Sequence, residues 1–160
     1  MLYIFDKDNT LVGGLVGNRP ANTPDEQQPL PGVLEKLADL RAQDHMIAIA
    51  SNQGGVAWGF IGEQQARALV RDAGQKVGGV DYWRCSCYDE RAAGRPGADP
   101  RFARASYRRK PRPGMLRELM REAGASAADT IMIGDQESDR QAAEAAGCRF
   151  VWAVDFFRRS

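Results

Sequence analysis

The sequence has little histidine and cysteine, and it contains no long hydrophobic run. Its 160 residues include one histidine, His45, and three cysteines, Cys85, Cys87 and Cys148. A zinc site uses about four Cys, His, Asp or Glu ligands, so Cys85 and Cys87 alone favour structural thiols over a bound zinc ion. An odd set of cysteines is typical of a reducing, cytoplasmic setting.

No apolar stretch approaches the roughly 20 residues of a membrane-spanning helix, and no basic segment followed by an apolar core indicates a signal peptide. We therefore expect no membrane contact. The 22 basic and 21 acidic residues nearly cancel, so the total charge indicates no partner. Residues 91–112 differ, with eight basic side chains and one acidic residue, Asp99. This segment suits a polyanion such as nucleic acid, and a solvated loop explains it equally well.

Apolar, strand-like runs alternate with amphipathic helical patterns along the chain. Strands are predicted at 2–5, 46–50, 82–87, 130–133 and 150–153, and helices at 31–43, 63–76, 113–123 and 136–146. Apolar strands without polar alternation are typical of a parallel sheet covered on both faces. We therefore predict one α/β domain over residues 1–160, with a doubly wound, Rossmann-like sheet of about five strands. Residues 12–30 and the basic loop 89–109 have no regular pattern.

The most informative cluster is Asp6-Lys7-Asp8-Asn9-Thr10, directly after the first predicted strand. In an extended segment, residues two apart point the same way, so Asp6 and Asp8 are expected on one side and Lys7 on the other. Two close carboxylates repel each other unless a cation lies between them or one gains a proton. The pair therefore indicates a metal site, an acid/base pair, or both.

Further polar clusters lie just after other predicted strands or just before a predicted helix. Ser51 and Asn52 follow the second predicted strand, Asp135 follows the fourth, and Arg109-Lys110 precedes the third helix. Ligands of open α/β sheets bind beyond the carboxyl ends of the strands, and the N-terminus of a helix favours anions. We expect the clusters to converge on one spot.

At that spot the carboxylates have distinct predicted roles. Asp6 is placed to attack phosphorus and form an aspartyl-phosphate. Asp8 would protonate the leaving oxygen and then take a proton from the hydrolytic water. Oxygen ligands suit Mg²⁺, so Asp6 and Asp135 are the predicted metal pair. Asp139, one helical turn beyond Asp135, would orient the waters on the metal.

The remaining groups would bind phosphoryl oxygens: Ser51 through its hydroxyl, Asn52 through its amide and Lys110 through its charge. Taken singly, such residues are more typical of a turn, an N-cap or a surface lysine. A functional site is favoured because all four clusters occur in the same chain, in this order and at these strand and helix ends. Four aromatic residues are expected in the core or a pocket wall rather than in a base-stacking platform: Trp58, Phe60, Trp83 and Trp152.

These clusters resemble the four motifs of the haloacid dehalogenase (HAD) superfamily of phosphohydrolases, and the resemblance covers almost the whole chain. The segment from Asp6 to Thr10 resembles motif one, Ser51 motif two and Lys110 motif three. Asp135 with Asp139 resembles motif four.

The resemblance implies a metal held by the Asp6 carboxylate, the backbone carbonyl of Asp8 and Asp135, with Asp139 as a further acidic residue of the metal site. Thr10 and Arg109, which belong to the same motif segments, are predicted with Ser51, Asn52 and Lys110 to bind substrate or phosphate.

Finer features resemble subgroup IIIA, which includes histidinol-phosphate and heptose bisphosphate phosphatases and also polynucleotide 3′-phosphatases. Members of this subgroup lack a large cap domain, and residues 12–30 would form a flap over the site. The chain departs from the heptose and histidinol enzymes at Ser106 and Arg108, where those enzymes carry the second cysteine pair of a zinc loop. It also departs at Trp58, where the heptose enzymes usually have arginine. Both departures put that substrate assignment in doubt.

The sequence thus predicts a Mg²⁺-dependent phosphomonoesterase acting through an aspartyl-phosphate, on a small phosphorylated metabolite such as a sugar phosphate or bisphosphate. A nucleic-acid 3′-phosphate end is the alternative substrate. A phospho-accepting signalling domain is an alternative of another class, and a catalytically inactive binding protein is a third. The sequence does not predict the oligomeric state.

Overall fold

The computed structural model describes residues 1–13, 15–17 and 19–159. Gly14 and Asn18, which fall in the predicted flap, and Ser160, at the end of the predicted domain, lie outside the described residues. Five parallel strands form one sheet in the order β3-β2-β1-β4-β5. The strands are β1 (Leu2–Phe5), β2 (Met46–Asn52), β3 (Tyr82–Ser86), β4 (Thr130–Gly134) and β5 (Arg149–Trp152).

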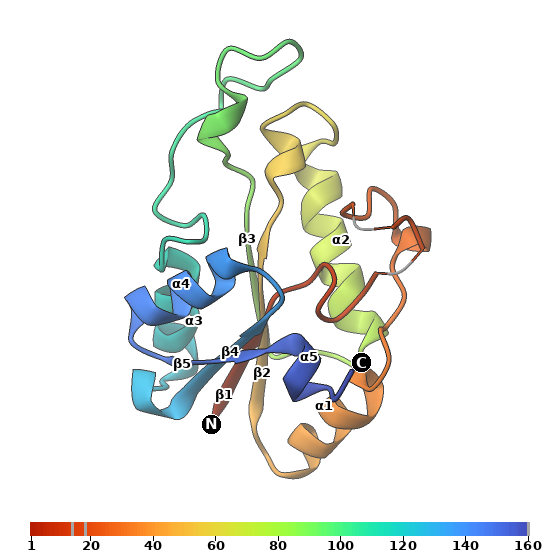
Figure 1. Cartoon of the computed structure of the whole chain (residues 1–160), viewed down its shortest axis with the longest axis vertical. Coiled ribbons are helices and arrows are strands. Elements are labelled where there is room, and N and C mark those ends of the chain that lie inside the picture. Colours follow the sequence, from red (N-terminus) through yellow and green to blue (C-terminus); the bar gives the residue numbers. More distant parts are fainter. Residues whose placement is uncertain (14, 18, 160) are drawn as a thin grey trace.

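Helices cover both faces of this sheet (Figure 1). They are α1 (Val33–Ala42), α2 (Glu63–Lys76), α3 (Gly114–Ala123), α4 (Glu137–Ala146) and α5 (Ala153–Phe156). Among the described residues, no helix combines the length and apolar character that crossing a membrane requires.

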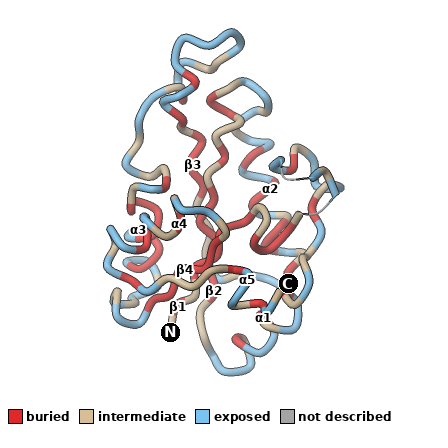
Figure 2. Tube along the Cα trace, viewed as in Figure 1, coloured by how far each residue is buried: buried red, intermediate tan, exposed pale blue. Residues whose placement is uncertain are grey.

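Side-chain alternation along β1 divides the interior into two cores. Leu2 and Ile4 are buried in a core that includes Leu116 and Leu119 of α3 and Met132 of β4. Phe5 points to the other face. There it joins a core formed with the apolar sides of α1 and α2, with members Val33, Leu37, Ile49 and Val70. Buried residues accordingly run along the central strands in Figure 2.

The doubly wound α/β fold predicted from the sequence is confirmed. Several predicted boundaries shift by one or two residues, and two of these shifts have a clear structural reason. β2 extends through Ser51 and Asn52, because both pair in register with β3. The last strand ends at Trp152, and Ala153 begins the short helix α5, which the sequence pattern did not predict.

Two irregular segments leave the sheet at its carboxyl edge (Figure 1). The first of them, residues 12–30, contacts α2 through Gln27, whose side-chain amide donates to the Leu69 carbonyl at 3.0 Å and whose carbonyl accepts from the Lys76 ammonium at 2.9 Å. Residues 88–109 follow β3 and extend farthest from the sheet. Both segments therefore flank the carboxyl edge of the sheet, where the polar clusters lie.

The core on the α3 side gives a direct test of the packing. Replacing the fully buried Leu116 by alanine should lower the free energy of unfolding by about 2–5 kcal/mol, because transfer energy is lost and a cavity remains. Leu34→Ala, on the exposed side of α1, should change it by no more than about 0.5 kcal/mol. Urea unfolding followed by circular dichroism measures both; equal losses would contradict this assignment of the core.

Candidate active site

A cavity of about 500 Å³ opens at the carboxyl edge of the sheet. Its walls include Asp6 and Asp8 after β1, Asn52 at the end of β2, Lys110 before α3, and Asp135 after β4. These residues come from four separate parts of the chain. The structure therefore brings these residues together at the carboxyl edge of the sheet, as the sequence predicted.

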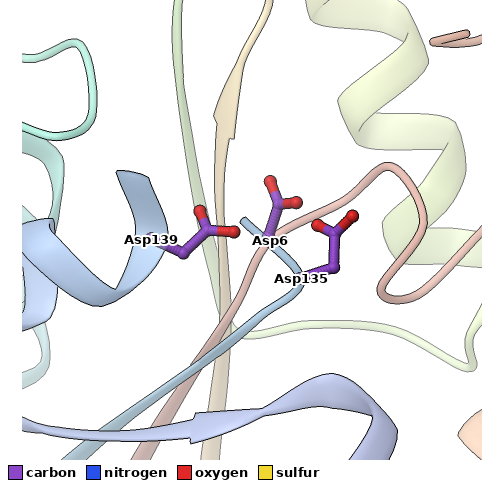
Figure 3. Close-up of side chains that lie close together, drawn as sticks. All are labelled: Asp6, Asp135 and Asp139. Carbon is purple, nitrogen blue, oxygen red and sulfur yellow. The ribbon is translucent and has the colours of Figure 1, made fainter. Parts of the chain in front are cut away.

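Three carboxylates lie at the centre of this cavity. Each of Asp6, Asp135 and Asp139 contributes an oxygen, and these oxygens all lie within 4.8 Å of one another. Figure 3 shows Asp6 between the other two carboxylates. Within the described part of the chain, no other group of three or more His, Cys, Asp or Glu side chains is close enough to share a metal ion.

Lys110 is the cation of the cluster. Its ammonium group donates to Asp6 Oδ1 at 2.9 Å, to Asp139 Oδ1 at 2.6 Å and to the Ala50 carbonyl at 2.8 Å. The lysine side chain is 2% exposed. All three donors are thus used in a buried position, which is the condition under which a buried charge is tolerated.

Burial and neighbouring charges shift the pKa values here. Burial raises the pKa of Asp6 to about 7; Lys110 opposes the rise, and the adjacent Asp135 reinforces it. Burial also raises the pKa of Asp139, again opposed by Lys110. Burial alone would lower the pKa of Lys110, but the two carboxylates beside it outweigh that effect and raise it.

The donor set fits a magnesium ion. When ionised, the three carboxylates carry three negative charges and Lys110 one positive charge, so two negative charges are left for a divalent cation to offset. Mg²⁺ prefers oxygen ligands and binds through one or two carboxylates. Asp6 and Asp135 would hold it, because both carboxylate oxygens of Asp139 already accept hydrogen bonds, from Lys110 and from the Gln136 N–H, whereas Lys110 bonds only to Oδ1 of Asp6.

Asp139 has a structural role that the sequence spacing did not reveal. Its Oδ2 accepts from the Gln136 backbone N–H at 3.1 Å, completing a capping box at the start of α4. Gln136 is the N-cap, so Asp135 precedes the helix, and the prediction that Asp139 lies one helical turn beyond it on the same face is wrong. A Cβ on Gly134 would overlap the Asp139 carboxylate, so this position requires glycine.

Asp8 lines the cavity with Asp6 and Lys7 does not, as predicted, but Lys7 is not separated from Asp8. The Lys7 ammonium group lies 2.7 Å from Asp8 Oδ1 and 2.6 Å from Gln27 Oε1, fully buried. The reason is that the regular strand ends at Phe5, so strand alternation does not hold across this segment. Lys7 thereby fixes Asp8 and joins it to residues 12–30.

The other predicted phosphate ligands divide into two groups. Asn52 lines the cavity and exchanges two 3.0 Å hydrogen bonds with the Lys110 backbone, so it positions that lysine. Ser51 and Thr10 are buried and do not line the cavity. The Ser51 hydroxyl donates to Gln53 Oε1 at 2.8 Å, and the Thr10 hydroxyl donates to Asp135 Oδ1 at 3.4 Å. Their contact with phosphate stays a prediction.

Arg109 also lines the cavity, held by a residue that the sequence analysis missed. Asp89 is 1% exposed, and its carboxylate accepts from the Trp58 indole at 3.0 Å and from Arg91 at 2.8 Å. Its Oδ2 lies 3.4 Å from Arg109. Although burial opposes it, these partners keep the pKa of Asp89 below its usual range. The sequence signal that could have found Asp89 is its position shortly after the end of a predicted strand.

The basic segment 91–112 is largely neutralised within the protein. Six of its eight basic residues have acidic partners: Arg91, Arg101, Arg108, Arg109, Lys110 and Arg112. The other two, Arg95 and Arg104, lie over the rings of Trp58 and Tyr88. Most of the positive charge seen in the sequence therefore lies beside Asp and Glu side chains, although Arg91 and Arg109 share one carboxylate, that of Asp89.

Comparisons with known proteins agree with this geometry. Residues 107–154 match the model of a family described as HAD-hydrolase-like. The chain is 30% identical over 155 residues to D-glycero-beta-D-manno-heptose-1,7-bisphosphate 7-phosphatase of Pseudomonas aeruginosa, covering 92% of this chain and 78% of that protein. The protein of the same name from Bordetella bronchiseptica is 33% identical over 150 residues, with 92% and 76% covered.

A solved structure is also similar. The crystal structure of D,D-heptose 1,7-bisphosphate phosphatase from B. bronchiseptica, complexed with magnesium and phosphate, matches with a TM-score of 0.74 at 29% identity. The match covers 93% of this chain and 78% of that chain. The similarity therefore extends over nearly the whole chain.

The raised pKa of Asp6 predicts how stability depends on pH in the metal-free protein. In the unfolded chain this carboxyl titrates near 3.8, and in the folded protein at about 7. Between these values the folded state holds a proton that the unfolded state releases, so the free energy of unfolding should fall as pH rises from about 4 to about 7.

Chemical denaturation across this pH range, in the presence of a chelator, measures the effect. Asp6→Asn cannot titrate, so its stability should fall less steeply with pH than that of the wild type. Asp139 retains a contribution of the same sign. Parallel curves for the two proteins would show that Asp6 is ionised throughout.

Proposed function

The chain belongs to the haloacid dehalogenase superfamily and is a phosphatase, and we propose that it hydrolyses a small sugar phosphate or bisphosphate through an aspartyl-phosphate on Asp6. One observation carries the proposal. The Asp6 carboxylate lies in the cavity, beside Asp135 and hydrogen-bonded to the buried Lys110. A nucleophile, a place for a cation and a fixed positive charge thus share one site.

In the proposed reaction, the Asp6 carboxylate attacks phosphorus while the bond to the leaving oxygen breaks, and Asp8 gives that oxygen a proton. Asp8 then takes a proton from the water that attacks the aspartyl-phosphate, which releases inorganic phosphate and restores Asp6. Lys7 supports both steps because its hydrogen bond to Asp8 Oδ1 fixes the orientation of the carboxylate.

Charge neutralisation is the other requirement, because a carboxylate and a phosphate dianion repel each other. Lys110 offsets one charge from its fixed position between Asp6 and Asp139. Mg²⁺, when bound by Asp6 and Asp135, would supply further positive charge for the phosphoryl oxygens. Asp139 acts through Lys110, since both its oxygens are used in holding that lysine and capping α4.

The names of the relatives support a sugar bisphosphate as substrate class. The nucleic-acid alternative rested on the basic segment, and most of that charge has acidic partners within the described residues. The signalling alternative requires a stable phosphoaspartate. Asp8 in the cavity beside Asp6 favours hydrolysis instead, because it is placed to activate water.

Substitution of the two aspartates separates their roles. Asp6→Asn should lower kcat at least about 1,000-fold, because the nucleophile is lost, and no phosphoprotein should form. Asp8→Asn should slow turnover and leave phosphorylated protein that is detectable by intact mass after acid quench. Asp44→Asn, on an exposed turn before β2, is the matched control and should keep wild-type rates. Wild-type turnover in Asp6→Asn would refute the mechanism.

Metal removal gives an independent test. EDTA should abolish phosphate release from sugar phosphates and bisphosphates, and added Mg²⁺ should restore it, because the carboxylate cluster repels an anionic substrate without a cation. A 3′-phosphorylated oligonucleotide, assayed at two salt concentrations, provides the comparison. Full activity in EDTA would remove the metal from the proposal, and a strong, salt-sensitive preference for the oligonucleotide would reverse the choice of substrate.

A further inference from the structure

A second cavity, of about 340 Å³, opens beside the catalytic one. The two share Pro20, Asn52, Asp89, Arg91 and Arg109 in their walls. A molecule whose phosphate lies at Asp6 therefore has the second cavity within reach of its leaving group. This second cavity differs in character, because aromatic side chains form part of its wall.

Trp58 and Phe60 form this aromatic wall. Their rings are stacked, with centroids 6.2 Å apart and an interplanar angle of 14°. Phe60 is 71% exposed, while Trp58 is partly buried. Although one side of the Phe60 ring stacks on Trp58, most of the side chain is exposed on the wall of a pocket, so it is available to a ligand.

The aromatic wall is held rigidly. The Trp58 indole donates to the buried Asp89 carboxylate at 3.0 Å. The Phe60 backbone N–H donates to the Gly55 carbonyl at 2.8 Å, and the Asp99 N–H to the Ala57 carbonyl at 2.9 Å. Between the two rings, Gly59 has φ of +82°, and a Cβ there would overlap the Gly97 carbonyl oxygen. These contacts hold the Trp58 ring and the backbone that carries Phe60, so the wall is built without a ligand.

Polar side chains beside the aromatic wall make this cavity suited to binding a planar heterocyclic ring. The same cavity is lined by three amide residues, Asn22, Asn52 and Gln53. Gln53 Oε1 accepts from Ser51, and the Asn52 amide already bonds to the Lys110 backbone, so Asn22 and the Gln53 NH2 group are the better candidates to meet a ligand. Aromatic faces stack on nucleobases, and amide side chains offer both donors and acceptors to the edges of a base. The C–H face of a sugar could also cover the Phe60 ring, but a base covers more of it and also presents donors and acceptors at its edge to the amide residues.

On the basis of the proposed phosphatase function, we propose that the preferred substrate is a phosphorylated sugar that carries a planar aromatic ring, the class of a nucleoside monophosphate. The ring stacks on Phe60, with Trp58 behind it, while the phosphate lies at Asp6. Asp89 is a positioning residue in this arrangement, because it holds both Trp58 in the second cavity and Arg109 at the junction of the two.

A matched pair of substrates tests this proposal. Adenosine 5′-monophosphate is ribose 5-phosphate with a base added, and adenosine 3′-monophosphate places the phosphate at the other end of the ribose. With Mg²⁺ present, at least one nucleotide should exceed ribose 5-phosphate by about tenfold or more in kcat/KM, as one stacked base allows. Phe60→Ala should remove this advantage through a raised KM, and Phe60→Tyr, which retains an aromatic face, should preserve it.

Controls separate the proposal from the general function. Leu34→Ala removes an equally apolar, exposed side chain on α1, far from the cavity, and should leave both substrates unchanged. Phe60→Ala should lower kcat/KM for the preferred nucleotide by about tenfold or more, and for ribose 5-phosphate by clearly less, since no base is present to stack. If ribose 5-phosphate and p-nitrophenyl phosphate are hydrolysed but neither nucleotide is preferred, or if Phe60→Ala leaves the preference intact, the base-stacking role is wrong and the phosphatase stands. If no phosphomonoester is hydrolysed, the proposed function itself fails.

Discussion

The buried ammonium group of Lys110 is the constraint on which the rest of the site depends. A lysine that is 2% exposed is tolerated only where its charge is paired and its donors are satisfied. Asp6 after β1, Asp139 on α4 and the Ala50 carbonyl on β2 supply those partners. One side chain therefore links three neighbouring strands at their carboxyl ends. It also brings two carboxylates closer together than their charges alone would allow.

Much of this could be predicted because the relevant signals are local. Apolar runs marked the strands, and their alternation with helices indicated a parallel sheet. Polar residues at the ends of those runs must then meet at one edge. Asp6, Asp8, Asn52 and Asp135 were found in this way, Lys110 was found from its place before a helix, and all five line the cavity.

The predictions that were wrong concern contacts between distant segments, or residues that lie beyond the end of a strand or before the start of a helix. The Lys7–Asp8 pair could not be predicted from strand alternation, since the strand stops at Phe5 and Gln27 arrives from another segment. Asp139 was assigned to a helical face shared with Asp135, but the helix begins after Gln136. The basic loop seemed available to a polyanion because sequence spacing does not reveal partners that arrive through folding.

The residues that carry out the proposed reaction and those that would select the substrate lie on different kinds of structural element. The phosphate end is built on strand termini, where the sheet fixes the positions of Asp6 and Asp135 and small shifts would disrupt the charge balance. The leaving-group end is built on loops, whose residues can change without disturbing the sheet. Asp89 joins the two ends, because Trp58 and Arg109 share one buried carboxylate. A change in the loop at Asp89 would therefore alter both the aromatic wall and the charge that faces the substrate, which couples the shape of the second cavity to binding at the first.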